Sequence, residues 1–299
     1  MFSGILVSLA LISVFALVLK KLALDKKLIV MAELLRARTR VWWAMCGVFA
    51  VAALTGGTGS ILVFALTSFL LLREFITITP TRKGDHHSLF WVFFIVLPLQ
   101  YYLLSIGWYG MFIILIPVYA FLFIPLCMAL DGDTFGFLER AAKIQWALMT
   151  CVYCISHAPA VLKISFPGGP GEGLRLLLYL CVIVQFSDVT QSLAAQTPFK
   201  VARPLAVGIV ASAVLGGGLW WATPFSLMQS AAMAVLITIM GAAGNLCYQA
   251  IMKDRGKPAI VVVRTRPSIM ERVMSLCFAA PIFFHIVRYF FTDRSPTSF

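Results

Sequence analysis

The sequence GNLCYQAIMKDRGKPAIVVVRTRPSIMERVMSLCFAAPIFFHIVRYFF, residues 244–291, holds a polar segment between two apolar runs. The polar segment extends from Lys253 to Arg272 and is rich in basic residues. Apolar runs of this length on both sides of a basic segment are typical of membrane helices joined by a charged loop. This stretch therefore predicts a membrane fold for the end of the chain.

The composition extends this prediction to the whole chain. Hydrophobic residues make up 61% of the sequence and charged residues only 12%, and the mean hydropathy is +0.94. Soluble domains carry about 25% charged residues. We therefore predict an all-α, polytopic membrane bundle, a single membrane domain over residues 1–299.

Apolar runs long enough to cross a hydrocarbon core of about 30 Å occur throughout the chain. They indicate nine or ten transmembrane helices, although the shortest runs leave a count of eight open. The predicted spans are 2–19, 41–54, 59–72, 89–107, 110–129, 145–164, 174–195, 205–222, 226–251 and 273–291.

The net charge of +12 is explained by membrane topology. With the N-terminus outside, alternate loops hold 20 of the 24 basic residues, as the positive-inside rule requires. Three of these loops, 20–40, 73–88 and 252–272, are expected to face the cytoplasm. Because no nucleic-acid motif accompanies the charge, we expect no nucleic-acid partner.

Asp188 is the one acidic residue inside an apolar run, 174–195. Charged groups at membrane depth are costly and usually face a cavity or one another. Helical spacing places Gln185 and Ser192 on the same face as Asp188. We expect Asp188 to share a polar pocket with Asn245 and Asp254, while a carboxylate at the membrane interface is the alternative. Ser156-His157 forms a second polar pair in an apolar run.

Several motifs, in order along nearly the whole chain, resemble those of the phosphatidate cytidylyltransferase (CDP-diacylglycerol synthase) family. They are Arg73-Glu74-Phe75, Gly132 to Leu138, Ile155 to Ala158, Phe186 to Gln191, and the region 244–281 that matches the C-terminal family signature. We identify the chain as a divergent bacterial member in which this signature is degenerate.

The resemblance implies transfer of CMP from CTP to phosphatidate, with release of pyrophosphate. Such a transfer depends on charge stabilisation and positioning, and Mg²⁺ would serve as the cofactor of an active enzyme. The resemblance assigns catalytic roles to Asp188, Lys253, Asp254, Glu271 and Arg272. It assigns substrate binding to Ser187, Gln191, Lys200, Arg203 and Asn245. Asp188, Asp254 and Glu271 would be the metal ligands.

The signature has lost several chemically important residues. The family Gly-Asp is Gly244-Asn245 here, and the last aspartate of the family Asp-Arg-x-Asp pattern is Met274. The Gly-rich turn is replaced around Pro267, which lacks a backbone donor. Removing one preorganised charge-stabilising contact typically costs 10²–10³ in rate.

We therefore predict an impaired or inactive phosphatidate cytidylyltransferase. Two alternatives stay open: an active enzyme with an altered metal site or lipid substrate, and a non-enzymatic lipid transporter or membrane scaffold. Whether the protein is an enzyme is thus undecided from the sequence. The expected partners are a phosphatidate-like membrane lipid and, in an active protein, CTP; a homodimer is left open. The resemblance implies a multi-pass protein of the bacterial inner membrane.

Overall fold

The structure is a computed structural model that describes Trp43, Gly47 and residues 57–164, 166, 171–194, 202–256 and 268–292. The chain divides into two compact units, and the helices discussed below belong to the unit Ile61–Ala259 with Ser268–Phe299, apart from the first four residues of the helix Gly57–Ile78. The described residues form helices and no strand. The predicted all-α fold is therefore confirmed.

The first described helix is Gly57–Ile78. The helices that follow it are α3 (His86–Trp91), α4 (Leu97–Ile106), α5 (Tyr109–Ile114), α6 (Phe121–Leu130), α7 (Phe137–Leu148), α8 (Ile155–Ala160), α9 (Glu172–Ala194), α10 (Ala202–Gly218), α11 (Leu227–Asp254) and α12 (Ile269–Phe290). Short π-helical stretches join α3 to α4, α5 to α6, and α7 to α8. Each of these pairs is thus one long helix with a local widening.

Six described helices are long and apolar enough to cross a membrane: Gly57–Ile78, Lys83–Ile106, Tyr109–Leu130, Glu172–Ala194, Leu227–Asp254 and Ile269–Phe290. The apolar helix α10 is shorter, at 17 residues. These helices agree with the predicted multi-pass membrane protein. The predicted spans 2–19 and 41–54 lie outside the described residues, apart from Trp43 and Gly47.

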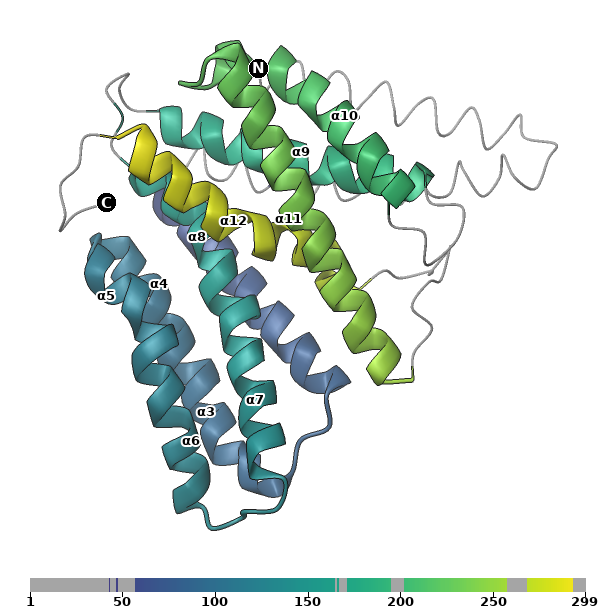
Figure 1. Ribbon diagram of the computed structural model, residues 1–299. Coiled ribbons are helices and arrows are strands. Elements are labelled where there is room, and N and C mark those ends of the chain that lie inside the picture. Colours follow the sequence, from purple (N-terminus) through teal and green to yellow (C-terminus); the bar gives the residue numbers. More distant parts are fainter. Residues whose placement is uncertain are drawn as a thin grey trace. The chain divides into compact units, whose positions relative to one another are not determined.

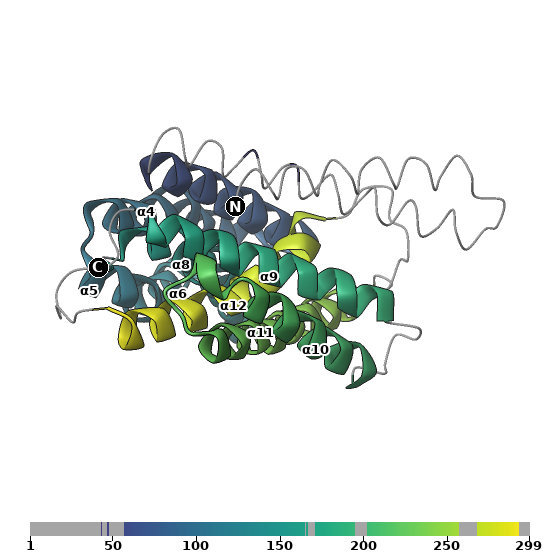
Figure 2. The same ribbon diagram turned by 90° about the horizontal axis from the view of Figure 1, so that it is seen from above.

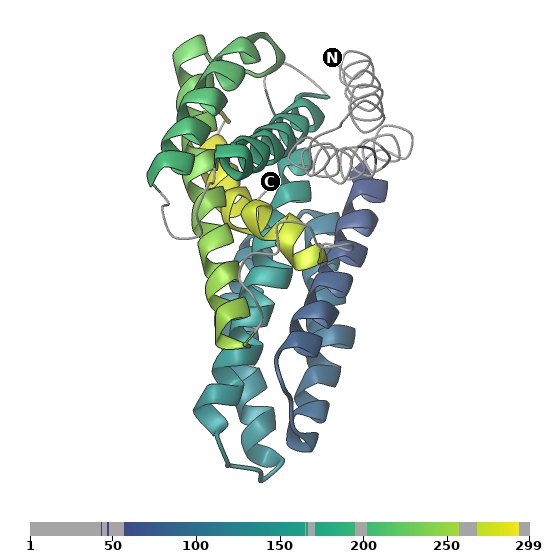
Figure 3. The same ribbon diagram turned by 90° about the vertical axis from the view of Figure 1, so that its right-hand side faces the viewer.

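The helices pack in sequence-adjacent and sequence-distant pairs. Helix α6 packs against α3 and α7, and these three run side by side toward the loops at one end (Figures 1 and 3). Helix α12 contacts α11, α9 and α8 (Figure 2). The C-terminal helix therefore lies among elements that come from much earlier in the chain.

A proline in α6 is compensated by a side chain of α7. Pro125 lacks the N–H that would reach the carbonyl of Phe121, four residues earlier in the helix. The amide Nε2 of Gln145 donates to that carbonyl at 2.9 Å. Gln145 is buried, so this bond satisfies two polar groups in an apolar environment. It also joins α6 to α7.

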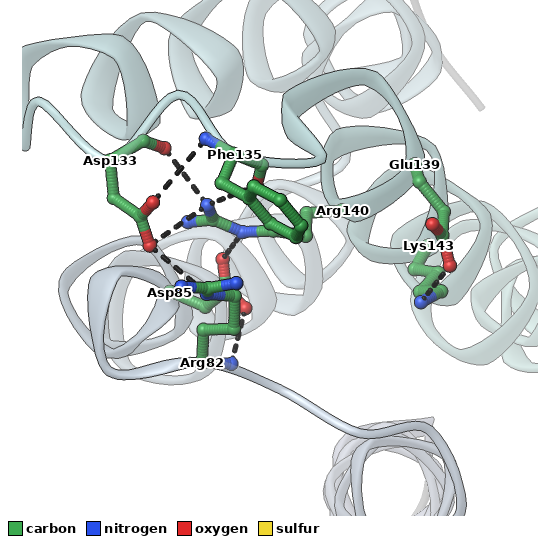
Figure 4. A network of polar contacts seen from close by, with 7 residues as sticks. All are labelled: Arg82, Asp85, Asp133, Phe135, Glu139, Arg140 and Lys143. Carbon is green, nitrogen blue, oxygen red and sulfur yellow. Dashed lines mark hydrogen bonds and ion pairs between the residues drawn. The ribbon is translucent and has the colours of Figure 1, made fainter.

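Two loops at the end of the α3, α6 and α7 group are held together by an ion-pair network centred on the buried pair Arg140 and Asp85 (Figure 4). Arg140 is only 5% exposed. Its Nε donates to Asp85 at 2.7 Å, and its Nη1 donates to the carbonyls of Asp133 and Phe135. Arg82 pairs with Asp133 at 3.3 Å. The segment before α3 and the segment between α6 and α7 therefore lie at the same end of these helices.

Candidate functional site

Asp188 is the centre of a polar cluster formed by three helices. It lies on α9 and is buried, with 6% of its surface exposed. Its Oδ1 accepts a hydrogen bond from Asn245 Nδ2 of α11 at 2.9 Å and another from Ser275 Oγ of α12 at 2.9 Å. The predicted contact between Asp188 and Asn245 is therefore present, and the carboxylate points into the bundle.

A glycine in α11 allows this close approach of helices. A Cβ on Gly244 would lie 2.5 Å from the main-chain oxygen of Met274 in α12. A Cβ on Gly241, by contrast, would make an ordinary contact with the side chain of Ser275, at 3.4 Å. A larger residue at position 244 would push α12 away from α11. The glycine that precedes Asn245 thus brings the two donors to the same carboxylate oxygen.

The two donors are electrically neutral and suit an ionised Asp188. Hydrogen bonds to a carboxylate are stronger than those between neutral groups, and a buried carboxylate needs such partners. The nitrogen side of the Asn245 amide faces Asp188, because the amide oxygen would be repelled by the carboxylate. An aspartate at position 245 could not make this contact without a proton or a cation between the two side chains.

Asp254 does not join this cluster. It ends α11, nine residues after Asn245, which corresponds to about 13 Å along a helix. Its side chain is 71% exposed and pairs with Arg255 at 3.3 Å. The expectation that Asp254 shares a pocket with Asp188 is thus wrong. The reason is that α11 continues for more than two turns beyond Asn245. Lys253, beside Asp254, is exposed as well.

Glu271 and Arg272 lie in the first turn of α12 and are both half-buried. Glu271 precedes Ser275 by one turn, about 6 Å along the helix, so the two residues share a face. No group of three His, Cys, Asp or Glu side chains that could hold a metal occurs among the described residues. Asp188, Asp254 and Glu271 therefore do not come together as one metal-binding group.

Ser187 and Gln191 form a separate contact on α9. Gln191 Nε2 donates to Ser187 Oγ at 2.7 Å. A Cβ on Gly208 of α10 would lie 2.7 Å from Gln191 Cγ, so Gln191 packs against α10. Arg203 is exposed near the start of α10, and Lys200 lies outside the described residues.

The second polar pair in an apolar run, Ser156-His157, contacts residues other than Asp188. His157 is fully buried and its Nδ1 donates to the carbonyl of Tyr153, one turn earlier in the same helix. Its ring packs against Phe112, Phe284 and His285. This contact satisfies Nδ1 within its own helix, whereas Nε2 is buried without a hydrogen-bond partner among the described residues.

Two residues at or near the cluster were not assigned from the sequence. Ser275 follows the position of the lost aspartate, Met274, and its hydroxyl bonds to Asp188. Glu74 accepts from the backbone N–H groups of Ile269 and Met270 at the start of α12. The Arg73-Glu74-Phe75 motif was a signal for Glu74, but nothing in the local pattern indicates its partner.

Comparison with known proteins assigns the sequence to a family. The model described as "Cytidylyltransferase family" matches residues 36–290. The chain is also similar to the "Uncharacterized protein YnbB" of Escherichia coli (strain K12), with 29% identity over 268 residues, which cover 84% of this chain and 87% of that protein. Because the family match spans most of the sequence, including α9, α11 and α12, this chain belongs to the cytidylyltransferase family.

Proposed function

We propose that this protein is an inner-membrane relative of phosphatidate cytidylyltransferase in which transfer of CMP from CTP to phosphatidate is impaired or absent. The observation that carries the proposal is the direct hydrogen bond from Asn245 to Asp188. A neutral amide there occupies the place where the family signature has a second carboxylate. The proposed unit of function is a single membrane domain over residues 1–299.

The residues of the cluster do not fit the magnesium ion that the family reaction implies. Mg²⁺ prefers oxygen ligands in near-octahedral geometry. Asp188 Oδ1 already accepts two hydrogen bonds, and Asn245 presents N–H rather than oxygen toward it. Asp254 is directed to Arg255 instead. We therefore derive no catalytic step through a metal in this protein.

The arrangement of the remaining charges supports a retained lipid or nucleotide interaction rather than catalysis. Glu271 and Arg272 lie within the first turn of α12, and Lys253 lies at the end of α11. Basic side chains beside a membrane attract anionic headgroups, at about 1 kcal/mol for each suitably placed residue. A phosphatidate-like lipid is the proposed ligand, with CTP as a second ligand if the nucleotide site persists.

A single assay tests the proposal. The purified full-length protein in vesicles that contain phosphatidate is supplied with CTP and Mg²⁺, and CDP-diacylglycerol formation is measured beside an active family member. We expect little or no product. A turnover on the order of 1 s⁻¹ or faster, within the usual enzyme range, would overturn the proposal. It would favour an active enzyme with an altered metal site, for which Glu271, one turn from Ser275, is the candidate carboxylate.

A further inference from the structure

We propose that Glu74 is a positioning residue that fixes the first turn of α12 and thereby the contact between Ser275 and Asp188. The inference concerns the site of the proposed function, but it does not depend on whether that site is active. It starts from a contact between residues almost two hundred positions apart in the sequence. Glu74 Oε2 accepts hydrogen bonds from the backbone N–H groups of Ile269 at 2.9 Å and Met270 at 3.2 Å.

The start of α12 has its backbone donors satisfied by side chains. The first N–H groups of a helix have no partner within the helix. Glu74 bonds those of Ile269 and Met270, and the hydroxyl of Ser268 accepts from Glu271 N–H at 3.1 Å. Tyr248 of α11 in turn donates to the hydroxyl of Ser268 at 3.5 Å. The N-terminus of α12 is therefore held by two other helices.

The N-terminus of α12 is a favourable place for the Glu74 carboxylate. Glu74 lies four residues before the end of the helix Gly57–Ile78. The N-terminal end of α12 carries the positive end of its helix dipole, which favours a negative charge in contact with it. Neighbouring residues such as Leu71 and Phe75 are buried, so the helix presents Glu74 toward the interior of its unit.

We call the two hydrogen bonds from Ile269 and Met270 to Glu74 the tether. The regular geometry of α12 links the position of the tether to the position of Ser275 in the polar cluster. Ser275 follows Ile269 by six residues, which is about 9 Å along a helix. A slip of one residue at the start of α12 would move Ser275 by about 1.5 Å along the axis and turn it by about 100°. The hydrogen bond from Ser275 to Asp188, 2.9 Å long, would not survive that change.

Hydrogen exchange measured on the purified full-length protein tests the tether. Glu74→Ala should accelerate exchange of the Ile269 and Met270 amides about tenfold or more, as expected when a hydrogen bond to a charged group is lost. Glu74→Gln should restore part of the protection, because its amide oxygen still accepts. Ser268→Ala is a control that removes a cap of α12 but leaves the tether. Glu139→Gln, on exposed Glu139, is a control for the change in charge.

A double-variant cycle tests whether the tether acts on the cluster. Ser275→Ala should lower the melting temperature less in the Glu74→Ala background than in the wild-type background, because Ser275 is no longer positioned there. Ser230→Ala, at a buried serine of α11 rather than α12, should have the same effect in both backgrounds. If Glu74→Ala does not fold, Glu74→Gln serves in the cycle.

Several outcomes would overturn the inference. Unchanged amide exchange at Ile269 and Met270 in Glu74→Ala would contradict the tether. Exchange that is accelerated equally in all helices would mean that Glu74 stabilises the whole protein rather than the start of α12. Additive effects of the Glu74 and Ser275 substitutions on the melting temperature would mean that the tether does not act on the contact between Ser275 and Asp188. Because none of these measurements uses CTP, detection of catalytic activity would overturn the proposed function without affecting the assignment of Glu74.

Discussion

Replacement of Asn245 by aspartate tests the electrostatics of the cluster most directly. Asn245 is the only asparagine in the sequence, and its amide donates to Asp188 at 2.9 Å. In Asn245→Asp, two carboxylates would face each other at roughly that distance. Two unit charges about 3 Å apart repel by about 5.5 kcal/mol at an effective dielectric constant of 20. The variant also loses a hydrogen bond to a charged group.

Because Asn245 is half-buried, water screens part of this repulsion, and we expect a net loss of about 3 kcal/mol from these two effects. At about 2 °C for each kcal/mol in a chain of this size, the melting temperature should fall by about 6 °C. The measurement is thermal unfolding of the purified protein in detergent at neutral pH, without divalent cations. Added Mg²⁺ should recover part of the loss in Asn245→Asp and leave the wild type unchanged.

The control is the exchanged pair Asp188→Asn with Asn245→Asp. It keeps one carboxylate and one amide across the same contact, so it should be more stable than Asn245→Asp alone. The reasoning fails if Asn245→Asp melts at the wild-type temperature in the absence of cations. It also fails if the exchanged pair is as unstable as the single variant, because the loss would then not come from two facing charges.

Three further substitutions test the packing around the cluster and at the end of the bundle. Gly244→Ala should destabilise the protein by about 1–3 kcal/mol, because its Cβ would lie 2.5 Å from the Met274 oxygen; an unchanged melting temperature would contradict the close contact of α11 and α12. Gln145→Leu should cost about 1–3 kcal/mol by leaving a carbonyl unsatisfied, and Pro125→Ala should reduce that cost by restoring the helical donor, which thermal unfolding of the single and double variants would measure. Arg140→Met should cost about 3–5 kcal/mol because it leaves a buried carboxylate without its cation; a stable variant in the same assay would show that the ion-pair network contributes little.

The amino-acid sequence alone determined the class of the protein and the frame of its site. Hydropathy predicted membrane helices, because a segment that spans the hydrocarbon must be apolar over its whole length. Asp188 was recognised as unusual because a carboxylate inside such a segment requires partners. The motifs along the chain resembled those of the family, which the comparison confirmed over residues 36–290. Each of these inferences depends on local composition or on order along the chain.

The tertiary structure decided which of the polar residues meet. Helical periodicity tells which residues share a face of one helix, but not which helix that face contacts or how far the two helices are displaced along their axes. Asp254 and Ser275 show the difference. Asp254 was predicted at the cluster and lies beyond it at the end of α11, whereas Ser275 was not assigned and bonds to Asp188. Glu74 and Ile269 meet across 195 positions, and only the packing of two separate helices brings such residues together.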